Sequence, residues 1–88
     1  MRKSRAILLR FMHDPGFRFE KVVVCYIDRG APGDETCVDG GRIMALDQQY
    51  MEIENPDGFT PIPYHRITRV LYEGIPFWER RKKENGWN

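Results

Sequence analysis

The apolar positions of this chain begin with the spacing of a helix. Residues on one helical face are apolar in the first turns, namely Ile7, Leu8, Phe11 and Met12. The pattern predicts a helix over residues 4–13, with Ser4 as the N-cap residue whose side chain accepts a backbone hydrogen bond. The helix is expected to end at Asp14-Pro-Gly16, because proline removes a donor and disfavours helical geometry in the residue before it.

After this point the pattern changes to short strands separated by turn residues. Residues 22–27 are all apolar, which is typical of a strand covered on both faces and predicts the centre of a sheet. Residues 36–38 and 42–46 flank Asp39-Gly-Gly41, which is a turn signal. Residues 50–54 alternate, with apolar side chains inward and acidic side chains outward.

A final hairpin is predicted over residues 67–72 and 75–79. The apolar spacing in its first strand departs from a period of two, and a bulge would return Ile67 to the core. In the segment before it, Pro61 and Pro63 restrict the chain to a sheet edge or a crossing, since proline cannot donate to a strand ladder.

The order of these elements predicts an α+β fold. One N-terminal helix is followed by five or six short antiparallel strands within a single domain of 88 residues. A single helix can cover only one face of a sheet, so we expect a strongly curled sheet or a small open barrel. The β-rich region is expected over about residues 21–81, and residues 82–88 form a polar tail.

Composition excludes several classes of protein. No apolar run is long enough to span a bilayer, and Arg10 interrupts the short apolar segment near the N-terminus, so we expect a cytoplasmic protein without a membrane partner. Cys25 and Cys37 lie in candidate strands and are expected to be buried, reduced thiols. The absence of a Cys-x-x-Cys or Cys/His cluster predicts no metal site, and no motif predicts a cofactor.

Charge is distributed unevenly although the net charge is only +1. Basic residues crowd both ends of the chain, namely Arg2, Lys3, Arg5 and Arg10 at one end and Arg80, Arg81, Lys82 and Lys83 at the other. If the termini lie close together, as termini often do, they form one basic face suited to a polyanion. The alternative is that these residues are solvated ends that keep the protein soluble.

Three short polar segments stand where strands should begin or end, at residues 26–30, 62–67 and 77–81. They place five candidate residues at the edges of the β-rich domain, namely Asp28, Arg29, His65, Arg66 and Arg80. Arginine and histidine side chains with aromatic neighbours are suited to holding a phosphate or a nucleotide.

At these segments the chain resembles a known family, the small domain named for RNA cyclic group end recognition. The resemblance runs from about Ser4 to Arg81 and rests on four pieces in order, namely His13-Asp-Pro15, Tyr26-Ile-Asp-Arg-Gly30, Ile62-Pro-Tyr-His-Arg-Ile67 and Trp78-Glu-Arg80. The family occurs alone in archaea and fused to RNA-processing enzymes in eukaryotes. One departure is His13, where the family usually has an aromatic residue.

The resemblance implies an RNA-binding module for RNA 3′ ends that bear a 2′,3′-cyclic phosphate or a related terminal phosphate. It also implies partners among RNA-processing enzymes, such as phosphodiesterases and nucleotidyltransferases. Arg29 and Arg66 are the first candidates for the phosphate, because a guanidinium donates two parallel hydrogen bonds to phosphate oxygens; each could instead pair with a local acid. His65 could donate to a phosphate oxygen or bond a backbone carbonyl, and Asp28 could orient Arg29 or bond its own turn.

The aromatic candidates are Tyr26, Tyr64 and Trp78, which could stack on bases or belong to the core. Arg80, with the basic residues that follow it, is expected to attract the RNA backbone rather than to specify its end.

Two other functions stay open. A small phosphodiesterase could open a cyclic phosphate with two histidines, but His13 and His65 lie in unrelated sequence contexts and no nucleophile motif is present, so a non-enzymatic module is favoured. A protein–protein adaptor would instead use an apolar patch, and its binding would not fall with ionic strength.

Overall fold

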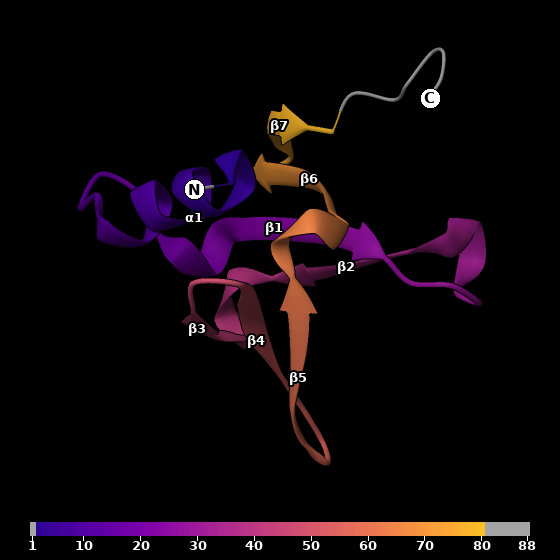
Figure 1. The fold of residues 1–88 in the computed structure, drawn as a ribbon. Helices are drawn as coiled ribbons and strands as arrows, with labels where there is room; N and C mark the ends of the chain where they lie inside the picture. The colour runs from indigo at the N-terminus through magenta and orange to yellow at the C-terminus, as the bar shows by residue number, and fades with distance from the viewer. Residues whose placement is uncertain (1, 81–88) are drawn as a thin grey trace.

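The computed structural model describes residues 2–80, which form one helix and seven strands in two antiparallel sheets (Figure 1). The elements in chain order are α1 (Lys3–His13), β1 (Val22–Ile27), β2 (Glu35–Asp39), β3 (Ile43–Leu46), β4 (Tyr50–Asn55), β5 (Gly58–Pro63), β6 (Ile67–Tyr72) and β7 (Ile75–Glu79). Short 3-10 turns connect several of them, namely η1 (Phe19–Lys21), η2 (Pro32–Asp34), η3 (Gly40–Arg42) and η4 (Tyr64–Arg66). The predicted α+β class is confirmed.

The sheets have the strand orders β2-β1-β6-β7 and β3-β4-β5. The predicted central strand is confirmed, since β1 pairs with β2 on one side and β6 on the other. The hairpin of β6 and β7 is also confirmed, and its register shifts between Val70 and Leu71, as the predicted bulge requires. Pro61 and Pro63 lie in β5, which is an edge strand. The N–H donors that these prolines lack are therefore not needed in the centre of a sheet.

One core joins both sheets and the helix. Side chains with no exposed surface come from α1, β1, β4 and β6, namely Leu8, Val22, Val24, Met51, Ile67 and Val70. Helix α1 contacts β3 of one sheet and β6 of the other, so its apolar face closes the core between them. No helix among residues 2–80 is long and apolar enough to cross a membrane.

The predicted single curled sheet or barrel is not what the described residues form. The chain leaves the larger sheet after β2, builds the smaller sheet from β3, β4 and β5, and returns at β6 (Figure 1). The 3-10 turns η3 and η4 lie at the two points where the chain passes from one sheet to the other. They change the direction of the chain, so β2 does not pair with β3 and β5 does not pair with β6. The predicted polar tail lies outside the described residues.

Two local predictions were wrong. Ser4 is not the N-cap, because the helix begins one residue earlier and its N-cap is Arg2, while the buried Ser4 hydroxyl donates to the Tyr64 carbonyl at 3.5 Å. Cys25 and Cys37 are not reduced thiols but a disulfide. Their residues are direct partners in the β1–β2 register, which places both sulfur atoms on one side of the sheet.

Candidate functional site

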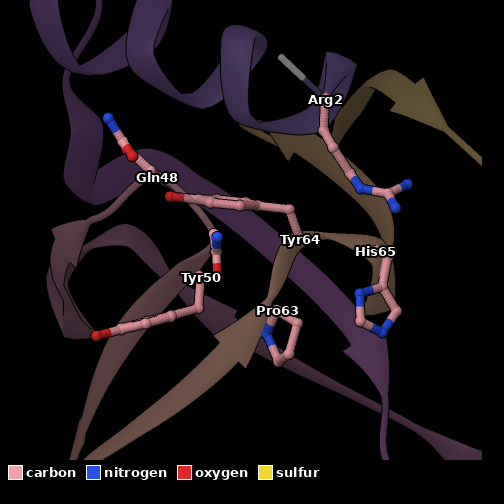
Figure 2. A pocket seen from close by; sticks show the side chains of 7 residues that line it. Arg2, Gln48, Tyr50, Pro63, Tyr64 and His65 are labelled. Atoms are coloured by element: carbon pink, nitrogen blue, oxygen red, sulfur yellow. The ribbon is translucent and has the colours of Figure 1, made fainter.

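A pocket of about 860 Å³ opens where the start of α1 meets the smaller sheet (Figure 2). Three parts of the chain line it: the helix N-cap, the connection from β3 to β4 with the first residue of β4, and the end of β5 with η4. The lining residues are Arg2, Gln48, Gln49, Tyr50, Pro63, Tyr64 and His65. Arg2 and His65 stand on one side of it and Tyr50 on the other (Figure 2).

The helix end at this pocket favours negative charge. Arg2 caps α1 without a side-chain hydrogen bond, and no acidic residue lies in the first turn. The first backbone N–H groups of a helix have no partner within the helix and carry its positive dipole end. Arg2 adds a full positive charge there, and His65 adds a ring with nitrogen donors, so this side of the pocket is suited to an anion.

Arg80 holds the turn that presents His65. Its guanidinium donates to the carbonyl oxygens of His65 at 2.8 Å, Ile67 at 3.1 Å and Tyr64 at 3.5 Å. The same group lies 5.6 Å from the ring centroid of the half-buried Trp78. Arg80, the residue after β7, therefore fixes the shape of η4, and Trp78 on β7 lies against its guanidinium.

The start of α1 lies near Arg80, since the Ser4 hydroxyl and the Arg80 guanidinium both donate to the Tyr64 carbonyl oxygen at 3.5 Å. Burial lowers the pKa of Arg80, and the positive charge of Arg2 lowers it further. The predicted basic residues Arg81, Lys82 and Lys83 lie outside the described residues. Arg2 and Arg80 thus bring positive charge from both ends of the described chain to the start of α1.

Tyr64 forms an inner wall of the pocket. Only 1% of its surface is exposed, and its hydroxyl donates to the Asp47 carbonyl oxygen at 2.6 Å. Burial raises the pKa of this hydroxyl, so it stays neutral and keeps donating at neutral pH. Arg5 donates to the same carbonyl at 2.7 Å and its guanidinium carbon lies 6.0 Å from the Tyr64 ring centroid. These bonds tie the β3–β4 connection to the helix and to η4.

Sequence reasoning missed the opposite wall, which consists of Gln48, Gln49 and Tyr50. Tyr50 is half-buried and begins β4. The negative charges of Asp47 and then Glu52 raise the pKa of its hydroxyl, so the ring presents a neutral phenol. The only signal in the sequence was a short polar run between two apolar strands, which is also typical of an ordinary turn.

Asp28 and Arg29 directly follow β1, and neither lines the pocket. The Asp28 carboxylate accepts from the Thr36 hydroxyl at 2.6 Å, and its N–H donates to the Asp34 carbonyl at 2.8 Å. Asp28 therefore closes the connection from β1 to β2. The Arg29 side chain is exposed, and within residues 2–80 its guanidinium forms no ion pair. The end of β1 pairs with the start of β6 at Tyr26 and Ile67, so Arg29 and η4 lie at the same end of these two strands although Arg29 does not line the pocket.

Arg66 and His13 complete the sequence candidates. Arg66 is exposed on η4, directly after His65, and it does not line the pocket. His13 is exposed at the last position of α1, and the pocket lies at the first. Of the two histidines, the pocket contains only His65.

Comparison with known proteins adds a family and two relatives. The family model described as the MJ1316 RNA cyclic group end recognition domain matches residues 1–80. The UPF0248 protein MK0350 of Methanopyrus kandleri is 29% identical over 75 residues, covering 85% of this chain and 96% of the relative. A UPF0248 protein of Thermococcus gammatolerans is 33% identical over 87 residues, covering 96% of this chain and 99% of the relative. No solved structure matches the chain significantly.

Proposed function

Because the chain belongs to the MJ1316 RNA cyclic group end recognition domain family, we propose that its pocket binds the 3′ end of an RNA. The terminus carries a 2′,3′-cyclic phosphate or a related terminal phosphate. The observation that supports this most directly is the meeting of Arg2 and His65 at the N-terminus of α1 in one pocket. The family name supports the cyclic form of the phosphate.

The phosphate oxygens bind on the basic side of the pocket. The Arg2 guanidinium donates two parallel hydrogen bonds, which is the geometry that suits a phosphate. The His65 ring donates another hydrogen bond from η4. The first N–H groups of α1 point toward the same anion and need no side-chain movement to do so.

The terminal nucleoside lies against the other wall. The Tyr50 ring stacks on the base, a contact worth about 1–3 kcal/mol in proteins that bind single strands. The amides of Gln48 and Gln49 each offer donors and an acceptor to the base edge. Tyr64 and Trp78, two candidates from the sequence, shape this pocket and do not stack on the RNA.

The strand upstream of the terminus contacts exposed basic residues outside the pocket. Arg66 follows His65 on η4 and Arg29 lies at the β1–β2 connection; both guanidinium groups are exposed and suited to backbone phosphates, which set affinity without specifying the end. Because the pocket contains only one histidine, the module binds the end without cleaving it. RNA-processing enzymes such as phosphodiesterases and nucleotidyltransferases are the proposed protein partners.

The test is a binding titration of one short RNA with three 3′ ends: cyclic phosphate, linear phosphate and hydroxyl. We expect the cyclic phosphate to bind most tightly and the hydroxyl least. His65→Ala should reduce the preference about tenfold, equivalent to about 1.4 kcal/mol, because the hydrogen bond that it removes is made only to the phosphate. Arg29→Ala should weaken all three ends alike, since it removes a backbone contact.

The matched control is Arg18→Ala. The Arg18 side chain is 70% exposed and pairs with Glu20, and neither residue lines the pocket. Its loss therefore changes the net charge as much as Arg29→Ala does, without changing the site. Equal affinity of the wild-type protein for the three ends would contradict the proposal and leave a general single-strand binder. Binding to none of them at low salt would favour a protein–protein adaptor.

A further inference from the structure

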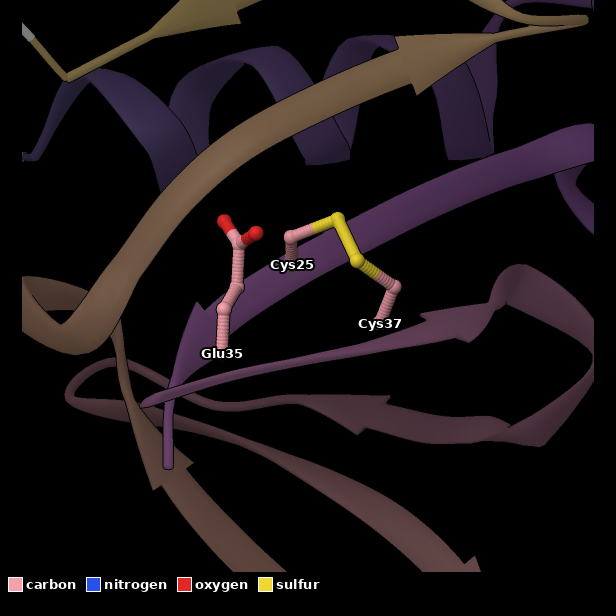
Figure 3. A group of neighbouring side chains, drawn as sticks. All are labelled: Cys25, Glu35 and Cys37. Carbon is pink, nitrogen blue, oxygen red and sulfur yellow. A yellow bond between two sulfur atoms is a disulfide. The ribbon is translucent and has the colours of Figure 1, made fainter. Parts of the chain in front are cut away.

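The disulfide of Cys25 and Cys37 lies beside a carboxylate. Glu35 is two residues before Cys37 on β2, so both side chains stand on one face of the sheet. Figure 3 shows the Glu35 carboxylate beside Cys25, near the disulfide. The two sulfur atoms and a Glu35 oxygen all lie within 4.8 Å of one another. Two sulfur atoms and one carboxylate oxygen thus lie close enough together to share one metal ion once the disulfide is reduced.

The neighbouring strand β6 fixes the direction of this carboxylate. The Thr68 hydroxyl donates to Glu35 Oε2 at 2.6 Å, and Arg69 donates to Oε1 at 3.1 Å and to Oε2 at 3.3 Å. Arg69 Nη2 also lies 3.7 Å from Cys25 Sγ. Hydrogen bonds of this kind orient ligating carboxylates in metal sites, and removing such partners commonly weakens metal binding about 10–100-fold.

We propose that the reduced protein binds a thiophilic divalent cation of the Zn²⁺ type through Cys25, Cys37 and Glu35, with water as the fourth ligand. Thiolate, imidazole and carboxylate are the ligands of tetrahedral zinc, and a site with three protein ligands leaves one position for water. The thiolates select a soft or borderline metal over Mg²⁺ or Ca²⁺. The site lies on β1 and β2, and none of its ligands lines the RNA pocket.

Charge balance supports a divalent cation. Two thiolates and a carboxylate bring three negative charges, and Arg69 offsets one of them through its ion pair with Glu35. A divalent cation neutralises the remainder. Cys25 is only 1% exposed, so a neutral site is much less costly there than an uncompensated pair of thiolates.

The disulfide and the metal exclude each other. A phosphine reductant breaks the S–S bond with one water molecule, giving two thiols and a phosphine oxide. The metal then displaces one proton from each thiol as it binds. The Cα atoms of the two cysteines are 3.9 Å apart and remain cross-strand partners. Because Cys37 is exposed on the edge strand β2, the metal can enter from solvent.

The experiment is a titration of the phosphine-reduced full-length protein with Co²⁺, followed by displacement with Zn²⁺. We expect stoichiometric thiolate-to-cobalt charge-transfer absorption, proton release on binding, and no such absorption from the oxidised protein. Cys37→Ser should abolish the two-thiolate spectrum. Glu35→Gln should weaken binding at least about tenfold, because it removes one ligand while keeping the side-chain size.

The matched control is Glu79→Gln. Glu79 is the exposed cross-strand partner of Arg69 on β7, so its loss removes a nearby negative charge without removing a ligand, and Co²⁺ binding should be unchanged. A reduced wild-type protein that shows no thiolate–cobalt absorption would overturn the proposal. So would equal Co²⁺ affinity of Glu35→Gln and wild type, with circular dichroism confirming that both are folded.

Discussion

Gly40→Ala is expected to destabilise the domain by more than about 3 kcal/mol. A Cβ atom at Gly40 would stand 1.9 Å from the carbonyl oxygen and 2.8 Å from the carbonyl carbon of Phe19. These are backbone atoms, so no side-chain rotation can relieve the overlap. The turns η1 and η3, which contact each other here, must separate and open the packing beside β1. Total stabilities are only about 5–15 kcal/mol, so a large share is lost.

Urea denaturation followed by circular dichroism measures this effect as a fall in the midpoint at an unchanged slope. The matched control is Gly41→Ala in the same 3-10 turn. Its Cβ would meet only the Asp39 carboxylate oxygen at 3.1 Å, and a side-chain end can move by the small amount required. Similar midpoints for the two variants would show that η1 does not press on Gly40 as described.

The strands were predictable wherever their signal is local. The unbroken apolar run of β1 and the alternation of β4 are properties of neighbouring residues, and both strands form as predicted. The bulge that returns Ile67 to the core also followed from spacing within one strand. Each of these predictions depends only on the apolar pattern of neighbouring residues, either an unbroken run or a period of two.

The division into two sheets was not predictable in this way. The turn signal at residues 39–41 is typical of a hairpin, yet β2 and β3 belong to different sheets. Gly40 packs against the Phe19 backbone at this point, and this contact depends on the packing of η1 against η3, which neighbouring residues in the sequence do not reveal. The pairing of Cys25 with Cys37 also depends on residues that are apart in the sequence, because it follows from the β1–β2 register.

The candidate site was predictable in part. His65 stands in a polar segment before a strand, which is a local signal, and the structure places it in the pocket. Arg2 was interpreted only as part of a basic end, and Tyr50 only as a strand residue. Both reach the pocket because α1 and the β3–β4 connection are tied together through the carbonyl of Asp47, a long-range contact that no spacing reveals.

Arg80→Ala is the second change with a large expected effect, because it acts on both stability and binding. It removes donors from three carbonyl groups of η4 and the start of β6. Hydrogen bonds from a charged donor contribute about 1.5–3 kcal/mol, and we expect a loss of stability of about 2–3 kcal/mol. Since the freed turn no longer holds His65 in the pocket, the preference for a phosphorylated RNA end should fall as far as in His65→Ala.

Arg80→Lys separates this positioning role from direct contact with RNA. Lysine keeps the charge but is a point donor, so it cannot span the three carbonyls as the planar guanidinium does. If Arg80 acts through η4, Arg80→Lys loses the end preference in the three-RNA titration while keeping the salt dependence of binding. Arg66→Lys is the matched control, because Arg66 is exposed on the same turn and should tolerate the exchange. Retention of the full end preference in Arg80→Lys would mean that charge alone matters, and the guanidinium network would then be incidental to recognition.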